Sequence, residues 1–274
     1  MTRLAVSIVT YHTPISELEL CLQALHSDLV ETIYIIDNSN ESYIAQFCEG
    51  KEKVQYIGGE NVGYGAGHNK ALRRTLESNV PYHLVMNSDI YFEPRVLDEI
   101  VAYMDSNPDV AQVHPKVLNP DGTLQYTVRM LPTPIHLLVR RFMPQCLQQK
   151  INYRYLLQFA NHDCEMNVPY HQGSFLFFRT DSLREVGLFD ERFFMYPEDI
   201  DITRRMHRHY RTMYYPAVSI VHDHRAASYK SWRMLYIHIV NMIRYFNKWG
   251  WIFDSERRSM NKKLLQSIAS QQSK

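Results

Sequence analysis

The sequence predicts an α/β protein, in which a sheet is flanked by helices and followed by an amphipathic helical extension at the carboxyl end. Short β-rich runs alternate with helical periodicity from residue 4 onward, polar residues follow the first strands, and helical spacing of apolar residues returns near the carboxyl terminus. Hydrophobic residues make up 45% of the 274 residues. This content is enough to bury a sizeable core.

The first elements follow one another in order along the chain. Residues 4–10 form a β-rich run, and the stretch after Pro14 has helical spacing through Leu18, Cys21 and Leu25. Further strands are expected at 32–36, 54–57, 82–86 and 110–113, and helices through Ala71, Leu72 and Leu76 and over 94–104.

Polar side chains stand at the ends of three of these strands. Thr10 and Tyr11 end the first, Asp37 and Asn38 follow the second, and Asp89 comes shortly after residues 82–86. In open parallel sheets, ligands bind at the carboxyl ends of the strands. We therefore expect these side chains to gather on one rim of the sheet.

A glycine-rich segment, residues 58–69, precedes the helix through Ala71. Its glycines would let the backbone approach a ligand, although Gly63-x-Gly65-x-Gly67 does not have the spacing of a Rossmann dinucleotide turn. A turn that binds nothing is the alternative interpretation.

The segment 189–201 packs five carboxylates and four aromatic rings into thirteen residues. Aromatic bulk excludes water and raises the basicity of a buried carboxylate, so this density suggests an active-site wall. The alternative is an acidic helix amino terminus, since Glu198, Asp199 and Asp201 precede several arginines in a helix starting near Pro197.

Three further elements are expected, namely a strand at 172–179, a helix near 182–186 and a strand at 217–221. Residues 119–170 are rich in proline and lack clear periodicity, so they are expected to form excursions over the sheet.

The carboxyl-terminal segment differs from the rest in charge. Residues 225–274 contain 10 Lys or Arg against 2 Asp or Glu, whereas residues 1–224 contain 20 against 27. The expected apolar helix face carries Leu235, Ile239, Met242, Phe246 and Trp249, and the polar face carries Lys230, Arg233, Asn241, Arg244 and Lys248. Such a basic amphipathic helix fits an anionic membrane surface. Packing on the rest of the protein or on a second subunit, as in a homodimer, is the alternative.

Other features of the sequence indicate the cellular location, the state of the cysteines and the partners to expect. The apolar run after Arg3 is too short for a signal peptide or a membrane span, so a cytosolic protein is expected. The four separated cysteines are expected to be reduced and structural. Nucleic acid is disfavoured as a partner because the acidic body would repel phosphates.

Seven motifs occur in an order that resembles a known family. They are Ser7–Tyr11, Asp37-Asn38-Ser39, Glu60-Asn61-Val62-Gly63-Tyr64-x-x-Gly67-x-Asn69, Asn87-Ser88-Asp89, the Phe-Asp-Glu block of 187–194, Glu198-Asp199-x-Asp201 and the late His222. Together they resemble the family-2 glycosyltransferases, and most of all the bacterial rhamnosyltransferase-type branch that builds O-antigen, capsule or other surface polysaccharide. The resemblance implies a GT-A (Rossmann-like) fold, a nucleotide-diphosphate sugar donor, a divalent metal, and transfer with inversion at the anomeric carbon.

The resemblance also implies roles for individual residues. Thr10, Tyr11 and Asp37 would hold the nucleobase and ribose of a UDP- or dTDP-sugar, and the rest of the donor pocket would be formed by Asn38, Asn61, Gly63, Asn69, Ser88 and Asp89. For the asparagines, a purely structural role as turn formers is the alternative.

The metal and the chemistry fall to four residues by the same resemblance. Asp89 would bind Mg²⁺ or Mn²⁺, and His222 would complete the site, with Asp223 and His224 as competing neighbours. Asp199 would be the general base, and Glu198 would assist it.

One departure from the family pattern bears on function. Asn87 stands where most relatives carry the first carboxylate of Asp-x-Asp, which suggests weaker metal binding. A catalytically silent nucleotide-sugar or glycan-binding module of the same fold is therefore the alternative to an enzyme.

These expectations combine into a domain plan. Residues 1–228 would form the catalytic domain, with a donor-binding half at 1–115 and an acceptor half at 116–228, and residues 229–274 the basic helical tail. The acceptor would be a glycan, free or linked to polyprenyl diphosphate, at the inner face of the cell membrane. Rhamnose is the sugar that the branch suggests, but the sequence does not identify it.

Overall fold

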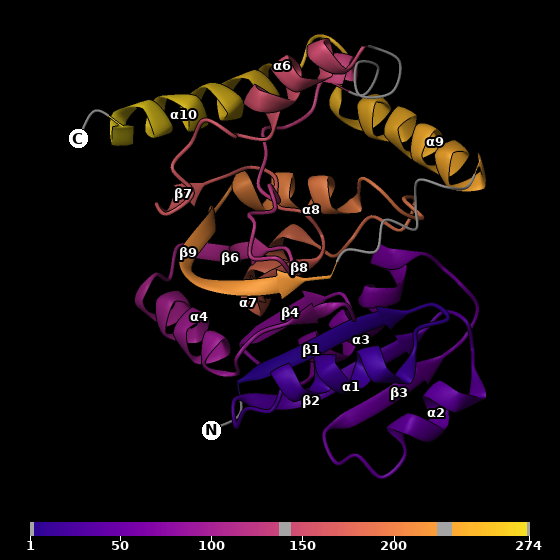
Figure 1. Cartoon of the computed structure of the whole chain (residues 1–274). Helices are drawn as coiled ribbons and strands as arrows, with labels where there is room; N and C mark the ends of the chain where they lie inside the picture. The colour runs from indigo at the N-terminus through magenta and orange to yellow at the C-terminus, as the bar shows by residue number, and fades with distance from the viewer. Residues whose placement is uncertain (1–2, 137–143, 224–231, 273–274) are drawn as a thin grey trace.

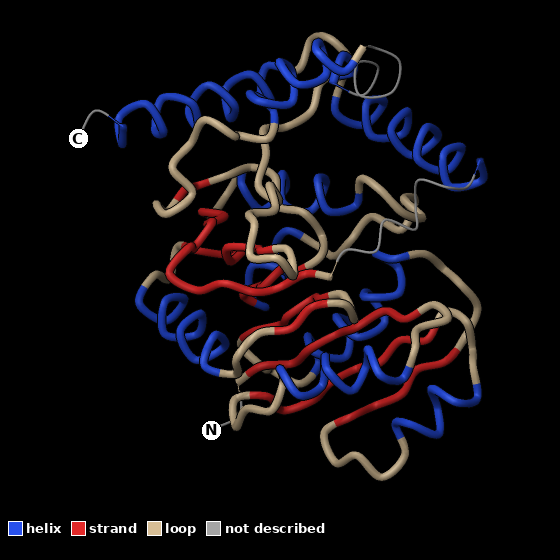
Figure 2. Tube along the Cα trace, viewed as in Figure 1, coloured by secondary structure: helices blue, strands red, loops and turns tan. Residues whose placement is uncertain are grey.

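The computed structural model describes residues 3–136, 144–223 and 232–272 and confirms the predicted α/β fold (Figure 1). Within these residues a single nine-stranded sheet has the strand order β3-β2-β1-β4-β8-β6-β9-β5, with β7 paired to β9. Figure 2 shows this sheet running through the molecule with helices packed around it.

The amino-terminal part of the sheet is parallel. Its strands are β1 (Leu4–Thr10), β2 (Val30–Asp37), β3 (Val54–Gly58) and β4 (Tyr82–Met86). The helices that connect and follow them are α1 (Ile15–Ala24), α2 (Ser42–Cys48), α3 (Tyr64–Glu77) and α4 (Arg95–Ser106). In the register, Thr10 lies beside Asp37, which brings the ends of β1 and β2 to one edge as predicted.

The second part of the sheet is mixed. It contains β5 (Ile90–Tyr91), β6 (Val110–Leu118), β7 (Met166–Asn167), β8 (Phe175–Arg179) and β9 (Arg211–His222), where β8 runs antiparallel to both β4 and β6. The helices of this part are α6 (Gln145–Tyr155), α7 (Thr180–Val186) and α8 (Glu198–His207). The short strand β5 pairs Ile90 with His222, so the chain just after Asp89 lies beside the end of β9.

Helices cover both faces of the sheet. The largest apolar cluster lies on one face, where Leu18 and Cys21 of α1 and Leu97 of α4 pack against strands. On the other face Leu72 of α3 and Ile202 of α8 pack against β4, β6 and β8. Burial on both faces explains why these strands are continuous apolar runs in the sequence.

A second core lies between the sheet and the carboxyl-terminal helices α9 (Trp232–Trp249) and α10 (Ser255–Gln272), which form an outer layer together with α6 (Figure 1). It joins Tyr214 of β9 to Tyr245 of α9 and Leu264 of α10. This core therefore contains residues from both sides of the predicted boundary at 228, and the domain division stays a prediction.

Several local expectations differ from the structure. The segment 119–170 contains α6 and β7, and residues 65 and 67 of the glycine-rich segment lie inside the first turn of α3. A Cβ at Gly65 would lie 2.9 Å from Phe189 Cβ, and one at Gly67 would lie 2.8 Å from Val9 Cγ2. These two glycines therefore permit close helix packing.

The predicted faces of α9 are partly wrong. Met242 and Phe246 are buried as an apolar face would require, but Ile239 is 47% exposed and Asn241, expected on the polar face, is 1% exposed. The reason is a hydrogen bond from Asn241 Nδ2 to Met195 O at 2.9 Å, which turns this side chain inward. Lys230 lies outside the described residues.

Of the helices within the described ranges, none combines the length and hydrophobicity needed to cross a bilayer.

Candidate active site

Asp37 is buried at the end of β2, and its carboxylate is already occupied by neighbouring groups. Oδ1 accepts hydrogen bonds from Ser39 N at 2.9 Å and Thr10 Oγ1 at 3.3 Å, while Oδ2 accepts from Glu41 N at 2.6 Å. Burial alone would raise its pKa, but hydrogen bonds from Ser39, Glu41 and Tyr56 outweigh burial and lower it. Asp37 is therefore an ionised side chain that fixes the loop after β2.

Hydrogen bonds join Gly63 to two asparagines, Asn38 and Asn61, near the end of β2. Asn38 Nδ2 donates to Gly63 O at 3.1 Å, and Asn61 Oδ1 accepts from Gly63 N at 3.0 Å. Asn38 Oδ1 is buried and has no hydrogen-bond partner among the described residues. A buried acceptor of this kind is costly unless something binds it, so it marks Asn38 as a candidate ligand contact.

Both its backbone conformation and the lack of room for a side chain require glycine at position 63. Its φ is +94°, and an added Cβ would lie 2.2 Å from Phe194 O. Next to it, Tyr64 N donates to Phe194 O at 2.9 Å. This contact joins the predicted donor loop to the Phe-Asp-Glu block of residues 189–194.

Asn69 of α3 also contacts the Phe-Asp-Glu block. Its Nδ2 donates to Phe189 O and to Glu191 Oε1, both at 2.9 Å, and its Oδ1 accepts from Phe189 N at 3.1 Å. Both ends of the amide are used inside the protein. Asn69 thus acts in the structure as a clamp between α3 and the Phe-Asp-Glu block.

Two of the predicted site residues are placed less distinctively. Tyr11 is 57% exposed at the rim, which leaves its ring available to a ligand. Ser88 Oγ donates to Glu17 Oε1 at 2.5 Å, so its hydroxyl positions the loop before Asp89.

Asp89 and His222, the two predicted metal ligands, lie together. Asp89 Oδ1 is 3.3 Å from His222 Nε2, the aspartate side chain is 19% exposed, and the histidine side chain is 1% exposed. The pairing of β5 with the end of β9 brings them to this distance, although 133 positions separate them in the chain.

Gln125 determines which ring nitrogen of His222 carries the proton. Gln125 Nε2 donates to His222 O at 2.7 Å, which fixes the amide so that its Oε1 faces His222 Nδ1 at 3.0 Å. Nδ1 must then carry a proton, and in the neutral ring Nε2 presents a lone pair to the carboxylate. Two acceptors that face one another require a proton or a cation between them. This donor set, one oxygen and one nitrogen with an oriented imidazole, fits a divalent metal.

Glu198 and Asp199 form the first turn of α8, as the helix-terminus interpretation predicted, but they are buried and not solvated. Their exposures are 4% and 9%. Asp199 Oδ2 accepts from Gly173 N at 2.9 Å and Oδ1 from Ile200 N at 2.8 Å, whereas Glu198 Oε2 is buried with no hydrogen-bond partner in the described part of the chain.

The surroundings of the two carboxyls separate their acidities. Burial and the adjacent charge of Asp199 raise the pKa of Glu198 far above its usual range. Burial also raises the pKa of Asp199, but the hydrogen bonds from Gly173 and Ile200 and the charge of Arg129 work against that rise. Glu198 therefore holds a proton more tightly than Asp199, and Asp199 is the member of the pair that ionises first.

Tyr64 belongs to one of the seven motifs, but the resemblance assigned it no role. In the structure it connects Asn87 with Gly173. Its hydroxyl oxygen lies 2.6 Å from Gly173 O and 3.0 Å from Asn87 Oδ1. Burial raises the pKa of Tyr64 strongly, and the electrostatic effect of the carboxyl groups of Glu198, Asp199 and Asp89 adds to that rise. The Tyr64 hydroxyl therefore joins Asn87, two residues before Asp89, to Gly173, whose N–H donates to Asp199.

The same contact gives a reason for Asn87. A hydroxyl has one proton, so it cannot donate to Gly173 O and to a second acceptor at full strength. An amide can turn over and donate to the hydroxyl oxygen instead, whereas an ionised aspartate cannot. Besides Tyr64, the residues that the sequence interpretation missed are Gly173, Gln125 and Arg129, which act on the site through Asp199 or His222.

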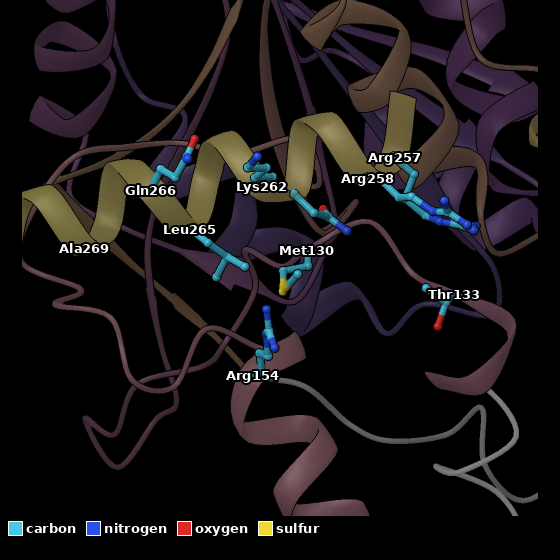
Figure 3. A pocket seen from close by; sticks show the side chains of 10 residues that line it. Met130, Thr133, Arg154, Arg257, Arg258, Lys262, Leu265, Gln266 and Ala269 are labelled. Atoms are coloured by element: carbon cyan, nitrogen blue, oxygen red, sulfur yellow. The ribbon is translucent and has the colours of Figure 1, made fainter. Parts of the chain in front are cut away.

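The cavity drawn in Figure 3 lies elsewhere. It measures about 450 Å³ and is lined by Met130, by Arg154 of α6 and by side chains of α10, including Arg257, Arg258 and Lys262. None of the site residues discussed above lines it, so it belongs to the carboxyl-terminal layer.

The fold is that of a GT-A protein, as comparison with solved structures shows. GalNAc-T7 with UDP, GalNAc and Mn²⁺ aligns with 90% of this chain and 48% of its own, at a TM-score of 0.62 and 12% identity. The mannosyltransferase PcManGT from Pyrobaculum calidifontis, in complex with GDP-Man and Mn²⁺, aligns with 98% of this chain and 75% of its own, at a TM-score of 0.57 and 15% identity. At these identities the likeness establishes the fold.

The chain belongs to a known family within this fold. The family model described as "Glycosyltransferase like family 2" matches residues 3–244. This match confirms the family that the seven motifs indicated.

The curated relatives include rhamnosyltransferases and a hexosyltransferase. The N-acetylglucosaminyl-diphospho-decaprenol L-rhamnosyltransferase of Mycobacterium tuberculosis is 28% identical over 62% of this chain and 58% of its own length. Rhamnosyltransferase WbbL of Escherichia coli is 27% identical over 78% of this chain and 81% of its own. The hexosyltransferase Agl10 of Haloferax volcanii is 28% identical over 75% of this chain and 62% of its own. The chain thus spans somewhat more than half the length of the mycobacterial relative.

Proposed function

We propose that this protein is an inverting glycosyltransferase that moves a sugar from a nucleotide diphosphate to a glycan acceptor in surface-polysaccharide synthesis. One observation carries the proposal, namely that Tyr64 connects the two candidate groups. Its hydroxyl contacts Asn87, two residues before Asp89, and Gly173, whose N–H donates to Asp199. A cation site and a carboxylate base in one buried place are what transfer from a sugar diphosphate requires.

The donor side is formed by the rim of β1 and β2. Tyr11 and Asn38 offer an exposed ring and an unsatisfied amide oxygen to a UDP- or dTDP-type nucleotide, while Thr10, Asp37, Asn61, Gly63, Asn69 and Ser88 hold the surrounding loops.

Asp89 and His222 would hold Mg²⁺ or Mn²⁺. Such an ion neutralises the charge that develops on the departing diphosphate, so that group leaves without a proton. Within residues 3–136, 144–223 and 232–272 no third His, Cys, Asp or Glu joins this pair, so the donor and water would supply the other ligands.

Asp199 would take the proton of the acceptor hydroxyl as its oxygen attacks the anomeric carbon. The backbone N–H groups of Gly173 and Ile200 hold the carboxylate in place and favour its ionised form. The raised pKa of Glu198 favours its neutral form, which would add no second charge beside the base. Attack from the side opposite the diphosphate in one step inverts the anomeric centre.

The acceptor is proposed from the relatives. The mycobacterial protein is named for a decaprenol-linked acceptor and, like WbbL, for rhamnose. By analogy we propose a polyprenyl-diphosphate-linked glycan, a cytoplasmic location at the inner face of the membrane, and rhamnose as the first sugar to test, with O-antigen or capsule as the product.

The test is turnover of a panel of UDP- and dTDP-sugars with Mg²⁺ or Mn²⁺ and short lipid-linked acceptors, with the product anomer read by NMR. Activity should disappear with a chelator and fall about 10²- to 10⁴-fold in Asp199→Asn. Asp181→Asn is the control, because that aspartate is 86% exposed and lies in α7. Donor binding, read by thermal shift, should persist in both variants. Saturable donor binding without turnover in the unaltered protein would instead identify a silent binding module.

A further inference from the structure

Four apolar side chains of α9 form an exposed stripe. Trp232, Tyr236, Ile239 and Ile243 are 85%, 70%, 47% and 43% exposed. Spacings of four, three and four residues place them on one face of the helix. This stripe is distinct from the buried face, which carries Met242, Tyr245 and Phe246.

The stripe continues past the end of the helix. The Trp251 ring lies 5.2 Å from the Phe246 ring, and its indole nitrogen donates to Asn247 Oδ1 at 2.8 Å. Trp251 therefore folds back onto the last turn of α9, where its side chain is 43% exposed. Ile252 and Phe253 follow, 67% and 90% exposed. We call these seven residues the α9 surface (Trp232, Tyr236, Ile239, Ile243, Trp251, Ile252 and Phe253).

The charged residues that α9 itself carries beside the stripe are positive. Arg233 and Arg244 adjoin the stripe, and Arg258 Nη2 donates to Ile252 O at 3.0 Å. The acidic residues of segment 232–272 are Asp254 and Glu256, and both pair with Arg204. The rim therefore suits an anionic partner.

The inner side of α9 is fastened to the segment that leads into the candidate base. Asn241 Nδ2 donates to Met195 O at 2.9 Å, Arg244 Nη1 to Arg192 O at 2.7 Å, and the rings of His238 and Tyr196 lie 5.0 Å apart. Residues 192–196 run directly into Glu198 and Asp199. Whatever binds the α9 surface is thus held close to the acceptor side of the site.

We propose that the α9 surface docks the protein on an anionic lipid bilayer, so that an acceptor anchored in that bilayer meets Asp199. The choice of acceptor rests on the proposed function. Tryptophans at both ends of the stripe and arginines at its rim are the pattern of a helix lying in a membrane interface. A second copy of the chain is a poorer partner, because a twofold interface would bring the same arginines face to face.

The test measures binding of the full chain to vesicles of phosphatidylglycerol and phosphatidylcholine by co-sedimentation. The double variant Trp232→Ser with Phe253→Ser should bind at least about tenfold more weakly, because both side chains would lie in the acyl boundary. Arg233→Gln should weaken binding to anionic vesicles only. Tyr153→Ser, which removes a 53%-exposed ring from α6, is the control and should change nothing.

The outcomes separate this proposal from the proposed function. Binding is read without turnover, and turnover on a water-soluble acceptor should be unchanged in the double variant. Equal binding of the double variant and the unaltered protein would overturn the proposal. So would a dimer in sedimentation velocity that the double variant abolishes, since the α9 surface would then bind a second copy.

Discussion

Two regions of the molecule are assembled by different physics. The amino-terminal region, residues 4–86, is a row of parallel strands whose polar residues stand at strand ends. The carboxyl-terminal region, from α8 to α10, is joined by a buried arginine whose partners lie 50 and 52 residues further along the chain. Arg204 lies 2.7 Å from Asp254 and 2.8 Å from Glu256, and its guanidinium stacks on the Trp249 ring at 4.1 Å.

The difference shows where sequence patterns are informative. A strand end can be located from local periodicity, so residues such as Asp37 and Asp89 were found without knowing their partners. The partners of Arg204 depend on how three helices pack. A wrong helix face can result when such a partner is unknown, as happened for Asn241 of α9.

The largest expected effect is on the carboxyl-terminal region. Arg204→Ala leaves Asp254, which is 4% exposed, without its main partner, and removing one member of a buried pair costs about 3–5 kcal/mol. Urea denaturation should show this loss. Arg95→Ala is the control, because Arg95 and Glu93 form an ion pair that is 74% and 72% exposed and should cost less than about 1 kcal/mol. Equal losses would mean that the region does not depend on its buried arginine.

A second effect is expected where the two regions meet. Gly63→Ala puts a Cβ against Phe194 O and forces a non-glycine residue to φ +94°, a strain of about 1–3 kcal/mol before the clash is added. Gly50→Ala is the matched control, since its φ is +73° but nothing lies within 4 Å of the added atom. Calorimetry should show a larger loss for Gly63→Ala, together with weaker donor binding. If both variants lose the same stability, the contact with Phe194 is unimportant.

Much of the fold was predictable because both faces of β1, β2 and β4 are buried and their sequences are apolar runs. The runs at 4–10, 32–36, 54–57 and 82–86 are all strands, within a residue or two at each end. The strands β5 and β7 were missed, since each has two residues and exists only through pairing with β9. The helix α6 was missed because it has little amphipathic pattern and follows a proline-rich stretch.

Within the site, the sequence named the right partners for some contacts and none for others. Asp89 and His222 were paired by resemblance, and the structure places them 3.3 Å apart. The role of Tyr64 was missed because a tyrosine at a helix start has no chemical signature of its own. Its hydroxyl contacts residues 87 and 173, which are far apart in the sequence, so no local pattern could identify these contacts.

A third prediction concerns the buried pair and has a defined sign in pH. Because the folded protein raises the pKa of Glu198, the stability that this carboxyl contributes is present below its ordinary pKa of 4.5 and is lost as pH rises toward the folded value. Glu198→Gln removes that loss. The variant should match the parent in Tm near pH 4 and exceed it by a few degrees at pH 8. A constant difference at all pH values would show that Glu198 does not bind a proton on folding.

The smallest expected effect tests the link between the metal side and the base. Tyr64→Phe removes one hydroxyl and should cost about 0.5–1.5 kcal/mol of stability. Without the contact to Gly173 O, the N–H that Gly173 donates to Asp199 is held less firmly, so the pKa of Asp199 should rise. The acid limb of the pH–rate profile should therefore move to higher pH. Tyr214→Phe is the control, because that buried hydroxyl donates to His162 O at 3.0 Å in the second core. It should cost similar stability and leave the limb in place, and a shift of equal size in both variants would remove Tyr64 from the site.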